Sequence, residues 1–451
     1  MPLLATCIGV ILACSSDAHV GCSPTLTCSL RPERFAPPLA PDAGAQTCDL
    51  SLRRCPATQV SAGGRHTCVV TDADNALCWG DDSQAQRGPT LDTSATAHGT
   101  SFSEGFRGDA GAYLATVSRV LDSVQQVSAG GAHTCALLFD GRVKCWGQNT
   151  AGQVTGSSDP EIIDTPVDTG VSSATQIDAG ASHTCAIVPA GVACWGSQRY
   201  GQSGSAQSDE PLVPTLVPDT QGAVEVTCGV RHTCARLRTQ EVVCWGELVD
   251  SAGAPYVSVV PTHVPELHAL GISAGAGHTC ALAENYSVVC WGNNDSGQLG
   301  DGTFQASATL VAVLELAAGV GQVAAGGGEL DGRLVGHSCA IDKSSQVACW
   351  GRGAEGQLGS GVGADAANSQ VVLLARVFDS SDQPTLGSIV RVDLGAFHSC
   401  ALASQGALYC WGDDTFDQLG SNLGFRDGDS EESRTVVPGR AVRVGRFGSA
   451  R

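Results

Sequence analysis

One unit of sequence recurs seven times along this chain of 451 residues. Each copy has a β-branched residue, a small residue and Gly, then His-Ser/Thr-Cys, and later Cys-Trp-Gly. The copies occupy residues 60–80, 127–147, 177–196, 226–246, 272–292, 323–351 and 392–412. All seven Trp and fourteen of the 21 Cys occupy recurring positions of this unit. Such a repeat constrains the fold strongly, because every copy must form the same structural unit.

Side chains within each copy alternate with period two, as in half-buried strands. In the second copy His133 and Cys135 share one strand face, and Cys145 follows on the next strand. Nine residues separate the two Cys in six copies, and eight in the third. The third copy therefore lacks one residue. We place this deletion in the turn at 189–191, because a deletion within a strand would reverse its faces. We predict one cross-strand disulfide per copy: Cys68–Cys78, Cys135–Cys145, Cys185–Cys194, Cys234–Cys244, Cys280–Cys290, Cys339–Cys349 and Cys400–Cys410.

Most copies continue into a Gly-Gln-Leu-Gly-like turn, as at 296–300, then into a variable loop and a strand marked by Pro or Val. Four strands per repeat predict an all-β, seven-bladed β-propeller of four-stranded antiparallel blades. The array begins at Val60 with no Pro/Val strand before the first copy. A Pro/Val strand at 436–444 follows the last copy. We therefore expect the C-terminal strand to pair into the first blade and close the ring.

The cysteines and the N-terminus indicate export. Fourteen Cys at near-constant spacing suit an oxidising compartment, where they can form disulfides. The apolar stretch 3–14 ends in Ile-Leu-Ala-Cys, which resembles a bacterial lipobox and implies a signal peptide over 1–13 and lipidation of Cys14. We expect a tether over 14–59, the propeller over 60–446 and a tail over 447–451. Three pairings remain open for the tether cysteines Cys22, Cys28, Cys48 and Cys55.

Two segments of the fifth copy, GAGHTCAL (275–282) and WGNNDSGQLG (291–300), resemble the hallmarks of the regulator-of-chromosome-condensation (RCC1) repeat family. The resemblance implies a seven-bladed propeller. Nuclear members exchange nucleotide on a small GTPase and bind chromatin, whereas exported bacterial members include a β-lactamase-inhibitory propeller. The net charge of −20 argues against nucleic acid as a partner here, because phosphate binding needs clustered Lys and Arg.

The recurring His, Cys and Trp invite a chemical interpretation. Each copy offers a His/Cys/Cys set that resembles zinc ligation, but an oxidising compartment and the lack of a carboxylate lead us to predict no metal site. We expect each His to bond backbone of a neighbouring strand and each Trp to fill the core between blades. Cys228, which replaces an Ala of other copies, is expected to be a small buried core residue, with a reactive thiol as the alternative. We predict no catalytic residue and no cofactor, since no catalytic motif occurs in a suitable context. The seven His are His66, His133, His183, His232, His278, His337 and His398.

Differences between copies indicate where a partner binds, since binding residues concentrate on loops of a rigid scaffold. The sixth copy carries the insertion 327–336, and 89–119, 361–388 and 421–435 are other long connections. We predict a noncatalytic, monomeric interaction scaffold of the cell surface or periplasm that binds an unidentified protein or glycan. A guanine-nucleotide exchange factor and a carbohydrate-active or metal-dependent enzyme are the alternatives. The candidate partner-binding rim comprises Arg65, Arg231, Glu329, Asp331, Arg333 and Phe397.

Overall fold

The computed structural model describes residues 56–89, 118–314, 316, 319–360, 370–376, 388–420 and 441–444. All of them belong to the second of two compact units, Gln46–Arg451. Across these ranges every regular element is a β-strand. A search of the same residues finds no helix with the length and hydropathy to span a bilayer. The predicted signal peptide, Cys14, the tether cysteines and the tail lie outside the described residues.

The strands form seven antiparallel sheets of four, each built from strands consecutive in sequence. The first four blades are β1 Ala57–Ala62, β2 His66–Thr71, β3 Ala76–Gly80 and β4 Ser118–Leu121; β5 Val124–Ala129, β6 His133–Leu138, β7 Val143–Gln148 and β8 Ile162–Asp168; β9 Gln176–Ala179, β10 His183–Val188, β11 Gly191–Gln198 and β12 Ser208–Val217; and β13 Ala223–Cys228, β14 His232–Leu237, β15 Val242–Val249 and β16 Pro255–His263. The last three are β17 Ala269–Ala274, β18 His278–Ala283, β19 Val288–Gly292 and β20 Ser307–Ala312; β21 Gln322–Leu330, β22 Arg333–Ile341, β23 Val347–Arg352 and β24 Gln370–Arg376; and β25 Ile389–Leu394, β26 His398–Ala403, β27 Leu408–Gly412 and β28 Val442–Arg443.

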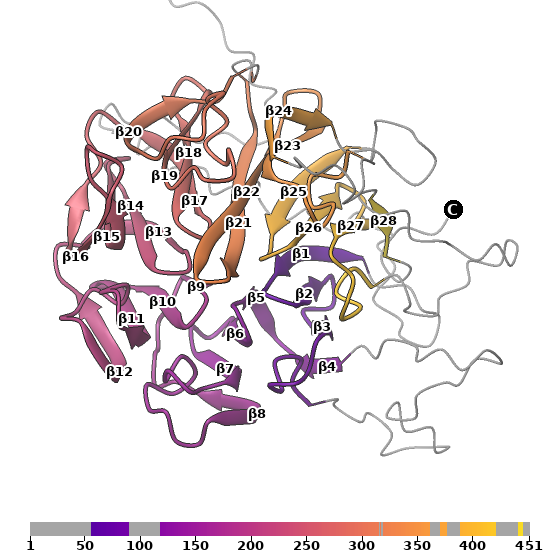
Figure 1. Ribbon diagram of the computed structural model, residues 1–451. Coiled ribbons are helices and arrows are strands. Elements are labelled where there is room, and N and C mark those ends of the chain that lie inside the picture. Colours follow the sequence, from indigo (N-terminus) through magenta and orange to yellow (C-terminus); the bar gives the residue numbers. More distant parts are fainter. Residues whose placement is uncertain are drawn as a thin grey trace, which may run out of the picture. The chain divides into compact units, whose positions relative to one another are not determined.

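The blades are arranged radially, with the first strand of each nearest the centre (Figure 1). The predicted seven-bladed propeller is thus confirmed. The Trp of each Cys-Trp-Gly segment is buried, as expected for core between blades. Trp146, for example, packs with Val70 and Val120 of the preceding blade. Burial of such large side chains at every junction is the main apolar contribution to holding neighbouring blades together.

The predicted closure of the ring by the C-terminal strand is wrong. β28 pairs with β27 of its own blade, through Tyr409↔Arg443 and Cys410↔Val442, and the first blade is completed by β4. The Pro/Val strand after each Cys-Trp-Gly thus belongs to the blade that precedes it, because it folds back antiparallel on its sequence neighbour. The seventh and first blades meet instead through main-chain bonds, such as Ala396 N–H to the carbonyl of Gly63 at 3.1 Å.

All seven predicted disulfides are present, with Cα–Cα distances of 4.0–4.1 Å. In every blade the two Cys lie directly opposite each other on the second and third strands. In the third blade Val188 pairs with Gly191, so the missing residue falls in the turn and the Cys pair keeps its register. β1 begins at Ala57, three residues before the expected start of the propeller.

Candidate functional site

The seven repeated His form a ring of hydrogen bonds between blades. Each Nε2 lies 2.8–2.9 Å from a Thr or Ser hydroxyl of the next blade, so the expected bond to backbone is wrong. The hydroxyl belongs to the residue that follows the recurring His, a signal present in every copy. The pairs are His66–Thr134, His133–Thr184, His183–Thr233, His232–Thr279, His278–Ser338, His337–Ser399 and His398–Thr67.

The protonation state of these His follows from their partners. At the junction of the first two blades, Thr134 donates its only hydroxyl proton to the main-chain carbonyl of Gln86 at 2.8 Å. His66 must therefore donate through Nε2–H, and its buried Nδ1 has no hydrogen-bond partner among the described residues. Burial lowers the pKa of His66 to about 3, so its imidazole is neutral at ordinary pH. This arrangement suits a structural role better than proton transfer.

The junction between the third and fourth blades brings His183, Cys185 and Cys228 within 4.8 Å of one another. Cys185 is bonded to Cys194, and His183 Nε2 is engaged by Thr233. The oxidised disulfide therefore withdraws Cys185 as a thiolate ligand. Burial raises the pKa of the Cys228 thiol well above its usual range, and its Sγ donates to the Asp178 carbonyl at 3.4 Å. Cys228 is thus the buried core residue expected from the sequence.

Two inner strands carry carboxylates where four of the other five blades have Ser or Thr. Asp178 Oδ2 accepts the Cys228 N–H, and Asp393 Oδ2 accepts the Ala62 N–H, both at 2.6 Å. In the first blade Ser61 fills the same position and accepts the corresponding N–H of the second blade. Burial raises the pKa of Asp178 and of Asp393 to about 7. The sequence reasoning missed both carboxylates, although alignment of the copies would have shown an acid at a Ser or Thr position.

The insertion of the sixth copy is a continuation of two strands. β21 and β22 stay paired through Glu329↔Leu334 and Leu330↔Arg333, and a two-residue turn joins them. Asp331 and Gly332 in this turn have φ of 49° and 78°, as a tight turn matched to the twist of a hairpin requires. Backbone pairing along the whole insertion makes it a defined hairpin. We call residues 327–336 the long hairpin.

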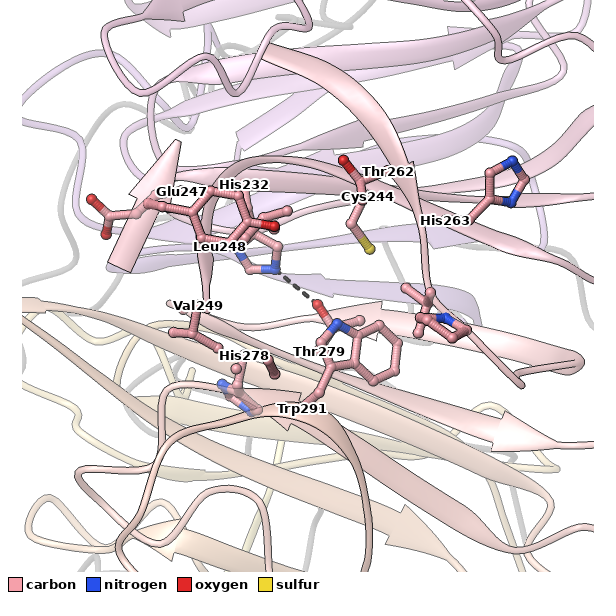
Figure 2. Close-up of a pocket in the computed structure, with 16 residues that line it drawn as sticks. His232, Cys244, Glu247, Leu248, Val249, Thr262, His263, His278, Thr279 and Trp291 are labelled. Carbon is pink, nitrogen blue, oxygen red and sulfur yellow. Dashed lines mark hydrogen bonds between the residues drawn. The ribbon is translucent and has the colours of Figure 1, made fainter. Parts of the chain in front are cut away.

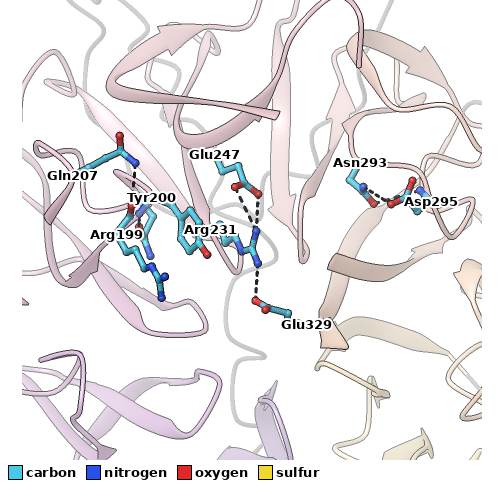
Figure 3. Close-up of polar contacts among 9 residues, drawn as sticks. Arg199, Tyr200, Gln207, Arg231, Glu247, Asn293, Asp295 and Glu329 are labelled. Atoms are coloured by element: carbon cyan, nitrogen blue, oxygen red, sulfur yellow. Dashed lines mark hydrogen bonds and ion pairs between the residues drawn. The ribbon is translucent and has the colours of Figure 1, made fainter. Parts of the chain in front are cut away.

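Residues of the long hairpin contact the adjacent fifth and seventh blades and also the fourth blade. Glu329 forms an ion pair with Arg231 of the fourth blade at 2.9 Å, and Arg231 also pairs with Glu247 at 3.2 Å (Figure 3). The guanidinium of Arg231 lies over the Tyr200 ring, 4.4 Å from its centroid. The side chain of Leu334 lies close to Gly277 of the fifth blade, where an added Cβ would meet it at 2.7 Å.

The remaining rim residues divide between the base and the tip of this hairpin. Phe397 of the seventh blade lies against Gly328, where an added Cβ would be 3.4 Å from the ring. Arg65 stacks over Phe416 at 4.7 Å and does not join the hairpin contacts. Asp331 and Arg333 are exposed at the tip, beside Leu330, which is 40% exposed. The structure thus brings Arg231, Glu329 and Phe397 to the base of one projection and leaves its tip to solvent. Of the other long connections, 89–119 and 421–435 fall almost entirely outside the described residues, and 361–388 is described only at 370–376, which is β24, and at 388.

The seven four-stranded, disulfide-bonded blades define a seven-bladed β-propeller. One hairpin, the long hairpin, extends beyond the others at one rim of it. RCC1 repeats match residues 57–86, 124–153, 191–236, 271–298 and 389–418. The chain therefore contains repeats of the regulator of chromosome condensation (RCC1) type.

Curated relatives match over short stretches. The probable E3 ubiquitin-protein ligase HERC4 of Homo sapiens is 37% identical over 87 residues, which cover 19% of this chain and 7% of HERC4. Alsin of Homo sapiens is 34% identical over 76 residues, which cover 17% of this chain and 4% of alsin. The chain therefore spans only a small part of the length of these relatives.

Solved structures match over most of the propeller. Human WBSCR16 aligns with a TM-score of 0.63 and 18% identity, covering 82% of this chain and 94% of that one. Yeast RCC1 (Prp20), solved bound to Kap60, aligns with a TM-score of 0.59 and 18% identity, covering 75% and 78%. At this level of identity the likeness establishes the fold.

Proposed function

We propose that this protein is a noncatalytic, exported interaction scaffold of the cell envelope, lipidated at Cys14, and that it binds a protein partner through the tip of the long hairpin. The RCC1-like propeller supports a role in protein interaction, since yeast RCC1 was solved bound to Kap60 and Prp20p was studied for binding to Gsp1p and histones. Kap60, Gsp1p and histones are partners of those yeast proteins. The partner proposed here is recognised by this chain's own rim.

The long hairpin is the observation that carries the proposal. Its base is held by the Arg231–Glu329 ion pair and by contacts with the fifth and seventh blades, whereas Leu330, Asp331 and Arg333 at its tip face solvent. A projection ordered before binding loses little conformational entropy when it inserts into a partner. Its tip combines one apolar and two charged side chains, the mixture that protein interfaces use.

The seven disulfides support export. Each closes a hairpin inside a blade, and both sulfurs of every pair are buried. Such bridges persist in oxidising compartments and are rare in the cytosol. Differential alkylation of native cells, followed by mass spectrometry of the Cys peptides, tests this part of the proposal. Recovery of the repeat cysteines as free thiols would contradict export.

A pull-down from envelope fractions tests the rim. The test variant combines Leu330→Ser with Arg333→Glu, which changes the tip without touching the base contacts. The control variant is Phe139→Ser, because Phe139 is 59% exposed in a turn of the second blade. We expect a partner captured by the wild type and by Phe139→Ser to be lost with the tip variant. Equal capture by the tip variant would refute the hairpin as the binding site.

A further inference from the structure

Six of the seven junctions between blades are completed by one main-chain carbonyl. A loop after the third strand of one blade places a Gln carbonyl against the next blade, where the Trp indole N–H and the Thr or Ser hydroxyl both donate to it at 2.8–3.1 Å. The side chain of each Gln caps its own loop, as where Gln153 Oε1 accepts the Ala151 N–H. The six are Gln86, Gln153, Gln202, Gln298, Gln357 and Gln418.

The loop that would carry this carbonyl is replaced in the fourth blade by a hairpin. There β15 continues past Gly246 and pairs with β16 through Glu247↔Val257, Leu248↔Tyr256 and Val249↔Pro255. The turn at 250–254 is closed by Asp250, whose carbonyl accepts the Gly253 N–H. In the fifth blade, by contrast, the corresponding strands end and begin at Gly292 and Ser307, with a loop containing Gln298 between them. The junction between the fourth and fifth blades therefore lacks the carbonyl.

Two hydrogen-bond donors of the fifth blade are left without that acceptor. Thr279 and Trp291 are directly opposed residues on β18 and β19 and lie side by side in Figure 2. Among the described residues, Trp291 Nε1 has no hydrogen-bond partner, and its residue is 7% exposed, whereas the other six Trp are 0% exposed. The Thr279 hydroxyl lies 2.8 Å from His232 Nε2 and 3.5 Å from the disulfide sulfur of Cys234. With His232 in the tautomer that His66 has at its filled junction, Nε2–H donates to Thr279, and the hydroxyl proton of Thr279 is left with only the sulfur, a weak acceptor.

A pocket of about 230 Å³ occupies this junction. One water needs roughly 10–15 Å³, so the space admits several atoms of a ligand. Thr279, Trp291 and His232 line one part of it, Glu247, Thr262, His263 and His278 are further polar lining residues, and aliphatic or aromatic side chains form much of the remainder (Figure 2). The apolar lining includes Leu248, Val249, Tyr256, Val264, Pro265 and Ala308.

We infer that this pocket binds an uncharged polypeptide turn of a partner protein, which inserts a main-chain carbonyl between Thr279 and Trp291. The six filled junctions show the chemistry of the occupant, because a Gln carbonyl meets the same two donors in each. The residue after that Gln is Leu or Val in four of them, and Leu299 and Val154 are fully buried. The apolar lining of the open pocket can receive such a side chain. A carboxylate is disfavoured, because Glu247 also lines the pocket and the protein carries a net charge of −20.

The pocket is separate from the tip of the long hairpin, so this inference goes beyond the proposed function and can fail without it. Hydrogen exchange of the seven indole N–H groups tests the open donor directly. In protein labelled with ¹⁵N-Trp, we expect the Trp291 signal to exchange with solvent much faster than the other six, which donate to buried carbonyls. Protection of Trp291 equal to theirs would overturn the inference.

Titration with a peptide tests the occupant. The probe is an N-acetylated, C-amidated copy of residues 149–156 (NTAGQVTG), which is uncharged and forms hydrogen bonds within its own turn. We expect it to shift the Trp291 indole signal and leave the other six unchanged, and a scrambled peptide to have no effect. Trp291→Phe should weaken binding by roughly two- to tenfold, the effect of one net hydrogen bond. The matched variant Trp195→Phe, at a filled junction, should bind like wild type.

A second variant keeps the test independent of folding defects in Trp291→Phe. Replacing residues 247–257, between the paired Gly246 and Ser258, by residues 148–162, between the paired Gly147 and Ile163 of the second blade, should place a Gln carbonyl in the pocket. We expect this variant to protect the Trp291 N–H from exchange and to abolish peptide binding. The inference would be overturned if the peptide bound the graft or Trp291→Phe as tightly as wild type. It would also be overturned if the peptide shifted only indole signals other than that of Trp291.

Discussion

Replacing Asp393 by Ser is expected to stabilise the propeller at pH 8 and to change its stability little near pH 4. Asp393 Oδ2 accepts the Ala62 N–H at 2.6 Å, across the junction of the seventh and first blades. Ser61 and Ser128 make the corresponding bond at two other junctions, so a Ser hydroxyl can replace the carboxylate there. The substitution keeps the hydrogen bond and removes an ionisable group from a buried position.

The magnitude follows from the pKa of Asp393. Its pKa is raised from 3.8 to about 7, mainly by burial and in part by the charge of Asp178, while the hydrogen bond from the Ala62 N–H and the charge of Arg391 oppose the rise. Between pH 3.8 and about 7 the carboxyl is therefore protonated in the folded state and ionised in the unfolded state. The stability that this group contributes below pH 3.8 is lost as the pH rises towards 7. At about 1.4 kcal/mol per pKa unit, the loss at pH 8 is at most about 4 kcal/mol, because Asp393 retains partial exposure.

Thermal unfolding of the oxidised protein between pH 4 and 8.5 measures the effect. With an unfolding entropy of about 2.1 cal/mol/K per residue, the gain at pH 8 corresponds to a rise in Tm of up to about 5 °C over the unit Gln46–Arg451. The variant is compared with wild type at each pH, since the buried His also make stability depend on pH. Ser61→Ala is the control, with a loss of about 1 kcal/mol at every pH. A difference between Asp393→Ser and wild type that does not grow from pH 4 to pH 8 would refute the reasoning.

Two further predictions concern the repeated residues. Replacing Cys68 and Cys78 together by Ala should lower the free energy of unfolding by about 3 kcal/mol, as chain entropy predicts for a loop with a sequence separation of 10, and an unchanged Tm without reductant would contradict this. His133 has its pKa lowered to about 3 by burial, so it contributes stability above pH 6.5 that is lost as the pH falls. His133→Gln, which retains an N–H donor, should therefore shift the acid-unfolding midpoint to lower pH, and a midpoint equal to wild type would show that this His does not titrate on unfolding.

The predictions that were confirmed depend on residues close together within one copy, where the repeat and the strand alternation are informative. Cys135 and Cys145 lie on facing strands of one hairpin, so period-two alternation was enough to predict their bridge. The third copy kept its bridge because a two-residue turn absorbed the deletion.

The predictions that failed required contacts between copies. The Pro/Val strand lies between two Cys-Trp-Gly segments, and the repeat pattern is the same whichever blade it joins. Pairing of β28 with β27 decided the phase of the blades and removed the expected closure of the first blade. His66 and Thr134 are 68 residues apart, so their bond appears only when two blades pack together.

Seven alike units, their disulfides and the position of the one long insertion can be read from the sequence, because each of these depends on spacing within a copy. How the units fit together could be learned only from the contacts between blades. The structure shows that a Gln carbonyl completes six of the seven junctions, that the junction between the fourth and fifth blades lacks it, and that the insertion is a hairpin held by Arg231 of another blade. These features depend on hydrogen bonds and burial between residues far apart in the chain, which periodicity cannot specify.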